Sequence, residues 1–139
     1  MKTVFITGAA QGIGLAIARQ FAREDYQVGL FDINESRCKE LLSEPEFKDA
    51  VAGFCDVRDS ASIDQALAAF AQATGGRLDV LVNNAGVLSA GEIMTHTESQ
   101  IRAMVDVNVT GLTLVSCAAH SMLKGGRFGS ETWTCASGT

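Results

Sequence analysis

The sequence predicts an α/β fold in which helices cover both faces of a parallel sheet. Three observations predict this fold: a short apolar run ends in a glycine-rich turn, an amphipathic helical pattern follows that turn, and further apolar runs then alternate with helical patterns. Strands and helices in alternation are joined by right-handed crossovers, which make the strands parallel. The expected architecture has three layers, α/β/α, with about four to five strands.

The first strand, turn and helix carry the most informative pattern. Residues 3–6, Thr-Val-Phe-Ile, have the β-branched and aromatic content of a buried strand. The segment Thr7–Gly14, Thr-Gly-Ala-Ala-Gln-Gly-Ile-Gly, follows at once, and Ile13, Ile17 and Phe21 then recur at helical spacing. In this context a glycine pattern predicts a dinucleotide-binding loop of the Rossmann type. Glycines let the backbone approach a pyrophosphate, and the helix start offers unpaired N–H groups to the anion.

Apolar runs and helical patterns alternate up to residue 124. Further strands are expected at residues 28–31, 51–55 and 78–82. Helices are expected at residues 35–43, from Asp59 or Ser60 to Gly75, and from Thr97 to Leu123, where Thr97 and Gln100 have capping-box spacing. In the last helix we expect the buried side to consist of Ile101, Met104, Val105 and Leu112.

The pattern stops after Lys124. A fifth strand is due there, yet residues 125–133 carry Gly, Ser and Glu in place of a continuous apolar run. We therefore expect a dinucleotide-binding Rossmann domain at residues 1–124 and an atypical C-terminal tail at 125–139, formed by a loop or a frayed end.

The composition excludes several classes of protein. The 139 residues have 47% hydrophobic and 19% charged side chains and a formal net charge of −5. Without a basic run, neither nucleic acid nor an anionic membrane is an expected partner. Four cysteines without a Cys-x-x-Cys pair, and only two histidines, predict reduced thiols and no metal site. Since there is no signal-peptide pattern and no run of about 18 apolar residues, we expect a cytoplasmic protein.

Asp32 ends the second predicted strand, at the edge where ligands bind to open α/β sheets. A carboxylate there can accept hydrogen bonds from the adenosine ribose, and it repels a 2′-phosphate. Two unit charges about 4 Å apart interact by about 4 kcal/mol at an effective dielectric constant of about 20, so Asp32 favours NAD over NADP by at least about tenfold. Ala10 and Gln11 provide no cation for the phosphate. Alternatively, Asp32 only caps the following helix.

Polar residues also follow the third and fourth predicted strands. Asp56 can meet the adenine, although capping or a turn explains this residue equally well. Asn83 and Asn84, followed by Ala85 and Gly86, either form a simple turn or lie against a ligand. Both readings stay open for each position.

Asn108 lies in an apolar part of the long helix, and Gly111 follows one turn later. An asparagine inside a helix is usually exposed or bonded to a backbone carbonyl. A glycine inside a helix costs about 1 kcal/mol relative to alanine. The two residues suggest a close backbone approach or a kink that holds a water molecule.

These residues, in this order, resemble the short-chain dehydrogenase/reductase family, in its non-extended branch, over about residues 1–124. The resemblance implies hydride transfer between the nicotinamide of NAD(H) and a small alcohol or carbonyl substrate. It assigns to Asn108 the holding of a proton-relay water. The cofactor contacts that it implies are made by Thr7, Gly8, Gln11, Gly12, Ile13, Gly14, Asp32, Ile33, Asp56, Val57, Asn83, Asn84, Ala85 and Gly86.

The family's other catalytic residues have no match in this sequence. The family uses a tyrosine as general acid/base, a lysine that lowers the pKa of this tyrosine, and a serine that positions the substrate oxygen. The single tyrosine, Tyr26, precedes the second predicted strand, and no Tyr-x-x-x-Lys occurs. Ser130 and Ser137 match the serine only by proximity, so neither is assigned.

Three hypotheses about function follow. The first is an NAD-dependent oxidoreductase truncated or disrupted after Lys124, without turnover, because general acid/base catalysis is worth about 10²–10⁴-fold. The second is a non-catalytic NAD-binding or interaction module, in which the long helix pairs two copies into a homo-oligomer. The third is an inert fragment whose open strand edge tends to aggregate.

Overall fold

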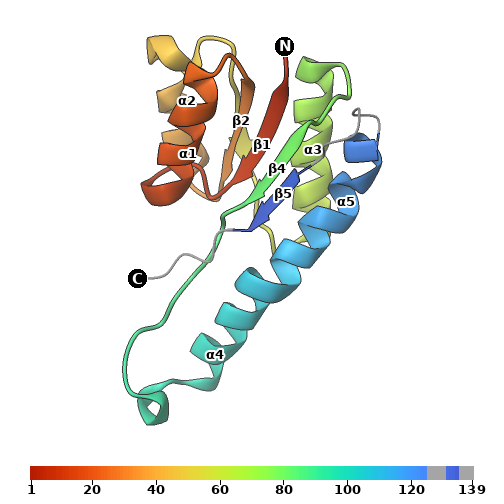
Figure 1. Ribbon diagram of the computed structural model, residues 1–139. Helices are drawn as coiled ribbons and strands as arrows, with labels where there is room; N and C mark the ends of the chain where they lie inside the picture. Colours follow the sequence, from red (N-terminus) through yellow and green to blue (C-terminus); the bar gives the residue numbers. More distant parts are fainter. Residues whose placement is uncertain (125–130, 135–139) are drawn as a thin grey trace.

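The computed structural model describes residues 1–124 and 131–134 (Figure 1). Its strands and helices alternate as the sequence predicts. In chain order they are β1 (Thr3–Thr7), α1 (Gly12–Arg23), β2 (Gln27–Asp32), α2 (Glu35–Leu41), η1 (Pro45–Phe47), β3 (Val51–Phe54), α3 (Ser60–Thr74), β4 (Val80–Asn83), η2 (Ile93–Thr95), α4 (Glu98–Val105), η3 (Asp106–Gly111), α5 (Leu112–Lys124) and β5 (Glu131–Thr134). The elements η1 and η2 are 3₁₀ turns, and η3 is π-helical.

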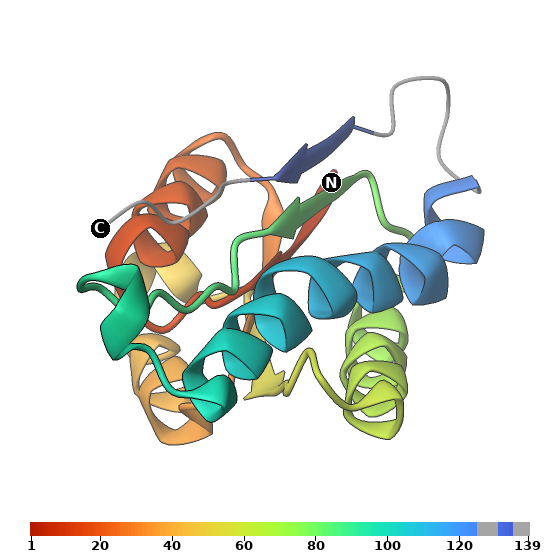
Figure 2. The ribbon, with the colours of Figure 1, turned by 90° about the horizontal axis from the view of Figure 1, so that it is seen from below.

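The five strands form one parallel sheet in the order β3-β2-β1-β4-β5. Helices α1 and α2 cover one face of this sheet, and α3 and α5 cover the other (Figure 1, Figure 2). The predicted three-layer Rossmann-type architecture is therefore confirmed. Because the strands are parallel, all their carboxyl ends meet at one edge, which is the lower edge in Figure 1.

Each face of the sheet has its own apolar core. On the face covered by α3 and α5, Phe5 stacks on Phe31 with 4.4 Å between ring centroids, and Phe70 meets Phe5 edge-on at 5.4 Å. Gly29 makes room for these rings, because a Cβ at this position would lie 2.8 Å from the ring of Phe70. The opposite core uses the alternate residues of the same strands, so β1 is buried on both faces and carries three successive apolar residues, Val4, Phe5 and Ile6.

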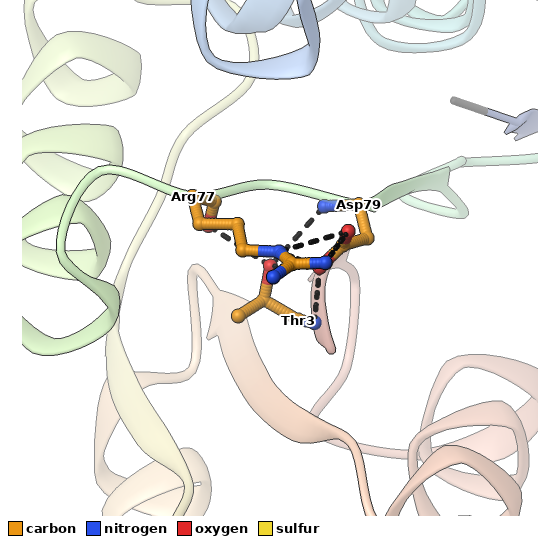
Figure 3. Close-up of polar contacts among 3 residues, drawn as sticks. All are labelled: Thr3, Arg77 and Asp79. Carbon is orange, nitrogen blue, oxygen red and sulfur yellow. Dashed lines mark hydrogen bonds and ion pairs between the residues drawn. The ribbon is translucent and has the colours of Figure 1, made fainter. Parts of the chain in front are cut away.

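Thr3, Arg77 and Asp79 join the amino ends of β1 and β4 (Figure 3). The Thr3 backbone N–H donates to Asp79 Oδ2 at 2.8 Å, and the Thr3 hydroxyl donates to the Arg77 carbonyl oxygen at 2.9 Å. Arg77 donates to both carboxylate oxygens of Asp79. Burial raises the pKa of Asp79, but the hydrogen bonds from Arg77 and Thr3 outweigh burial and lower this pKa. These contacts help to align the two strands.

The expectation that the tail contains no strand is wrong for residues 131–134. These residues form β5, which pairs in parallel with β4 from Val80↔Glu131 to Asn83↔Thr134. The open edge of β4 offers backbone N–H and carbonyl groups, and pairing with them overrides the poor strand composition of the segment. The rest of the predicted tail, residues 125–130 and 135–139, lies outside the described residues.

The helix predicted from Thr97 to Leu123 is present, but a π-helical turn divides it. Its predicted capping box is confirmed: Thr97 Oγ1 accepts from the Gln100 N–H at 3.2 Å, and Gln100 Oε1 accepts from the Thr97 N–H at 2.9 Å. The π-turn η3 spans the segment in which Asn108 and Gly111 suggested a kink. Such a turn adds one residue to the helical repeat and shifts the apolar stripe.

The predicted buried side of this helix is wrong at two positions. Ile101 and Val105 are 46% and 49% exposed, because α4 extends past the carboxyl edge of the sheet, where there is little to pack against (Figure 1). The buried positions begin in η3 and are Val107, Gly111, Val115, Ala119 and Leu123. They recur every four residues and therefore form one stripe.

By length and composition alone, the continuous helix Glu98–Leu123 could cross a membrane. Its second half instead packs into the core through Val115, Ala119 and Leu123. Among the described residues no other helix meets these two criteria. The absence of a membrane partner stays a prediction.

Candidate functional site

A cleft of about 590 Å³ opens at the carboxyl edge of the sheet. It lies between the glycine loop after β1, the ends of β2 and β3, the segment after β4, and the α4–η3 helix. Open α/β sheets bind ligands at this edge, beside the strand where the order of the sheet reverses. The lining residues are Gly8, Gln11, Gly12, Ile13, Asp32, Ile33, Cys55, Asp56, Val57, Arg58, Asn84, Ala85, Gly86, Val87, Ala103 and Val107.

Thr7 and Asn84 hold the glycine loop against the segment that follows β4. Asn84 Nδ2 donates to the carbonyl oxygens of Thr7 and Gly8, at 3.2 and 2.9 Å. Thr7 Oγ1 accepts from the backbone N–H groups of Asn84 and Ala85, at 3.2 and 3.1 Å. Gly14 packs into this junction, where a Cβ would overlap the Gly8 carbonyl and the Asn84 amide. Asn84 therefore connects the carboxyl ends of two strands and does more than form a turn.

The start of α1 offers unpaired backbone N–H groups at the cleft. No side chain caps this helix, and no acidic residue lies in its first turn. Asn34, Asp59 and Thr97, by contrast, cap α2, α3 and α4. An uncapped helix start with glycines before it attracts an anionic group through its N–H groups and its dipole.

Asp32 stands beside the glycine loop at the end of β2. Its Oδ2 accepts from the Ala10 N–H at 3.1 Å, and its Oδ1 accepts from the Asn34 N–H at 2.9 Å. The alternative that Asp32 merely caps α2 is not what the structure shows, because Asn34 Oδ1 accepts from the Arg37 N–H and provides that cap. The Asp32 carboxylate instead holds the glycine loop and lines the cleft.

Asp56 lies at the end of β3 and forms a closed pair with Arg58. Asp56 Oδ1 accepts from Arg58 Nε at 2.9 Å and from the Arg58 backbone N–H at 3.0 Å, and Oδ2 accepts from Nη2 at 2.7 Å. The hydrogen bond with Arg58 lowers the pKa of Asp56, against a smaller opposing effect of burial. Asp59 caps α3 through the Ala61 N–H, so Asp56 has the turn role and a place in the cleft, but not the capping role.

Asn108 clamps the segment that follows β4. Its Oδ1 accepts from the Val87 N–H at 2.8 Å, and its Nδ2 donates to the Val87 carbonyl oxygen at 2.7 Å. Gly111 lets η3 approach the segment that follows β3, because a Cβ there would lie 2.6 Å from Val57 Cγ2. The predicted close backbone approach is therefore present. The side-chain amide of Asn108 thus positions Val87, which lines the cleft, and one of its N–H groups and one of its lone pairs stay free.

His96 holds together residues 89–92, which follow Val87 in the chain, through contacts of its ring with two backbone carbonyl groups. Its Nε2 lies 2.6 Å from the Ser89 carbonyl oxygen, and its Nδ1 lies 3.1 Å from the Glu92 carbonyl oxygen. A neutral imidazole has one N–H and serves only one of these acceptors, whereas the imidazolium serves both. The hydrogen bonds to Ser89 and Glu92 accordingly raise the pKa of His96.

The structure brings most of the predicted cofactor residues to one cleft. Three of them do not line it and support its walls instead: Thr7, Gly14 and Asn83, whose Nδ2 donates to Ser116 Oγ at 2.9 Å. Sequence reasoning missed Cys55, Arg58, Val87, Ala103 and Val107. Cys55 and Arg58 flank predicted positions, and Ala103 and Val107 are one helical turn apart, which is the signal that could have identified them.

The remaining polar candidates lie away from the cleft or are inert. Tyr26 precedes β2, at the amino edge of the sheet, and packs edge-on against Phe21 at 4.9 Å. Ser130 and Ser137 lie outside the described residues. Cys55 lines the cleft, but burial, followed by the charges of Asp56 and Asp32, raises its pKa to about 12, so the thiol stays protonated and is a poor nucleophile.

The fold and the cleft define a Rossmann-type nucleotide-binding fold. The family model of the short chain dehydrogenases matches residues 2–131, and the chain belongs to this family. It is 38% identical over 131 residues to the 2,3-dihydro-2,3-dihydroxybenzoate dehydrogenase of Bacillus subtilis, covering 93% of this chain and 50% of that protein. It is 43% identical over 120 residues to the oxidoreductase UcpA of Salmonella typhimurium, covering 84% and 44%. The chain thus spans about half the length of these curated relatives.

Solved structures share this fold. An alcohol dehydrogenase from Thermococcus sibiricus, complexed with 5-hydroxy-NADP, superposes with a TM-score of 0.85 at 30% identity, covering 96% of this chain and 57% of that one. A 3-ketoacyl-(acyl-carrier-protein) reductase from Brucella melitensis, complexed with NADH, superposes with a TM-score of 0.82 at 28% identity, covering 89% and 51%.

The first prediction concerns the two helix-start glycines. Gly14→Ala should destabilise the fold by about 3 kcal/mol or more, because the new methyl group meets backbone that must move. Gly12→Ala should cost only about 1–2 kcal/mol, because the new methyl group has no neighbour within 4 Å and the only cost is the left-handed φ of +57°. Urea unfolding of both variants measures the difference. Equal losses of free energy would contradict the close packing of Gly14.

The second prediction concerns His96. Its pKa, measured by an NMR pH titration, should lie above the ordinary value of about 6.5. Because the folded-state pKa is raised, the two hydrogen bonds of the His96 imidazolium stabilise the fold fully below about pH 6.5. This stabilisation is lost as the pH rises through the folded-state pKa. His96→Gln should remove this pH-dependent part of the unfolding free energy. A titration midpoint at or below 6.5 would contradict the double hydrogen bond.

Proposed function

We propose that this chain binds NAD(H) in the cleft and forms the cofactor half of an oxidoreductase. The reaction would be hydride transfer between the nicotinamide and a small alcohol or carbonyl substrate. The relatives support this class, since they include a diacetyl reductase of Staphylococcus epidermidis that is 38% identical over 128 residues. The observation that carries the proposal is that the glycine loop, the uncapped start of α1 and Asp32 surround one cleft.

The walls of the cleft match the parts of a dinucleotide. The start of α1 would hold the pyrophosphate through its free N–H groups. Asp32 would accept hydrogen bonds from the adenosine ribose, and Ile33 and Val57 would flank the adenine near Asp56. The segment from Asn84 to Val87 would then adjoin the nicotinamide half. When bound, the cofactor would donate the hydride in its reduced form or accept it in its oxidised form, and these residues would bind and orient it.

The Asp32 carboxylate supports NAD(H) over NADP(H). Each of its oxygens accepts one backbone hydrogen bond, so about two of its four lone-pair sites stay free for ribose hydroxyls. A 2′-phosphate would instead bring a second negative charge to this carboxylate, at a cost of about 4 kcal/mol before solvent screening. Loss of the charge-assisted hydrogen bonds would add to that cost.

NADP(H) is the second candidate cofactor, and Arg58 is the observation in its favour. This guanidinium lines the same cleft, and the Thermococcus relative was solved with an NADP analogue. Arg58 already binds both oxygens of Asp56, however, so its charge is largely compensated within the protein. We therefore retain NAD(H) as the proposal.

The chain's own part in the chemistry is to bind and position. Asn108 fixes Val87 at the cleft wall, and the remaining N–H and lone pair of its side-chain amide would be available to a relay water. The family's tyrosine and lysine are not matched, so a non-catalytic NAD-binding module is the alternative, and the chain alone is expected to lack turnover. A cytoplasmic location is part of this proposal.

The third prediction tests cofactor choice. In calorimetric titrations the wild-type chain should bind NADH at least about tenfold more tightly than NADPH. Asp32→Asn should weaken NADH binding and reduce this ratio toward one, because it removes the charge but keeps the shape. Asp64→Asn, which removes an exposed carboxylate of α3, is the control and should leave the ratio unchanged. Tighter binding of NADPH by the wild type would overturn the preference, and binding of neither nucleotide would overturn the proposed function.

We propose that α4 and η3 pair two copies of the chain. Ile101, Val105 and Val109 are 46%, 49% and 60% exposed and are spaced four residues apart. The helix that carries this stripe extends past the sheet (Figure 1). An exposed apolar stripe on such a helix is a surface that an isologous dimer would bury.

The fourth prediction tests this pairing. Light scattering coupled to size exclusion should show a dimer for the wild type and a monomer for Val105→Glu, because a charge would be buried in the contact. Ser99→Glu, an exposed substitution on α4 outside the stripe, should leave the dimer intact. A monomeric wild type, or a dimeric Val105→Glu variant, would overturn the proposed surface.

A further inference from the structure

The pair of Asp56 and Arg58 is the one ion pair among the described residues that lies in the cleft. Arg58 folds back over two residues, and its Nε and Nη2 contact different oxygens of the same carboxylate. The backbone N–H of Asp56 donates to Ser62 Oγ at 2.9 Å, which fixes the main chain on the side of α3. The carboxylate is thus held both through its own backbone and through a rigid guanidinium.

Counting acceptor sites shows what this geometry leaves free. A carboxylate has about four lone-pair sites. Both sites on Oδ1 are used, by the backbone N–H and the Nε of Arg58, and one site on Oδ2 is used by Nη2. One acceptor site on Oδ2 therefore remains free on a residue that lines the cleft, and the backbone N–H and guanidinium of Arg58 together hold the carboxylate in this orientation.

We propose that Arg58 is a positioning residue that makes the adenine end of the cleft select an aminopurine over an oxopurine, by fixing Asp56 so that one oxygen accepts one hydrogen bond. This inference rests on the proposed binding of a dinucleotide. The 6-amino group of adenine is a donor that satisfies Oδ2. Hypoxanthine has an acceptor oxygen at that position and carries its donor on the neighbouring ring nitrogen, so it fits only a carboxylate that can rotate.

The test compares NADH with reduced nicotinamide hypoxanthine dinucleotide in calorimetric titrations. The wild type should prefer NADH by about tenfold or more, the range for a hydrogen bond to a charged group. Arg58→Ala should lower this ratio to about threefold or less, because the freed carboxylate can meet the ring nitrogen of hypoxanthine. Binding of reduced nicotinamide mononucleotide, which lacks the adenosine, should be the same in both proteins.

Two variants serve as matched controls. Arg77→Ala removes the equivalent pair of an arginine with the aspartate two residues later, at the opposite edge of the sheet, and should keep the wild-type ratio (Figure 3). Arg58→Lys keeps the charge without the planar fork and should not restore the ratio. Circular dichroism melting should show Arg58→Ala folded, since the Arg58 side chain is 53% exposed.

The outcomes separate the possible failures. A wild type that discriminates between the two dinucleotides while Arg58→Ala keeps the full ratio overturns the inference alone. Full rescue by Arg58→Lys also overturns it, because charge and not geometry would then be responsible. A selective loss of NADPH affinity in Arg58→Ala would make Arg58 a phosphate ligand instead. A wild type that binds neither dinucleotide overturns the proposed function and this inference with it.

Discussion

The junction between Thr7 and Asn84 is the constraint on which the site depends. The first strand and the fourth are far apart in sequence, yet the Asn84 amide satisfies two carbonyl oxygens of the glycine loop, and the Thr7 hydroxyl satisfies two N–H groups of the opposite segment. These groups are buried or partly buried, so leaving them without a partner would be costly. The junction leaves no volume for a side chain at Gly14, which brings the start of α1 to the cleft.

The π-turn at η3 connects this junction to the outer wall of the cleft. It allows Gly111 to approach Val57, and it directs Asn108 toward Val87, so that one irregular turn contacts the segments that follow β3 and β4. The same turn changes the helical repeat at the point where the buried stripe of α5 begins, whereas Ile101 and Val105 of α4 face solvent because α4 extends past the sheet.

The charges of the cleft are held by the protein's own donors. Asp32 is fixed by two backbone N–H groups, and Asp56 is fixed by a guanidinium. Each carboxylate keeps only the acceptor sites that its partners leave free, and ordered acceptors discriminate between ligands more strongly than mobile ones. Selectivity at the ribose and at the base would then reflect preorganisation, which depends on Ala10 and Asn34 at Asp32 and on Arg58 at Asp56.

The sequence by itself determined the elements and most of the cleft. Apolar runs, the glycine loop, the cap at Thr97 and the strand ends at Asp32, Asp56 and Asn83 all follow from local patterns, because spacing and turn chemistry act within a few residues. Only the tertiary structure decided that residues 131–134 pair with β4 and that Ile101 and Val105 face solvent. It also decided that the Arg58 guanidinium forms an ion pair with the Asp56 carboxylate. Each of these outcomes depends on groups that folding brings together. They are the open edge of a strand, the part of a helix that extends past its sheet, and the several acceptors among which one guanidinium chooses. A periodic pattern carries no information on such contacts, since it records the geometry of one segment and not the surface that this segment meets.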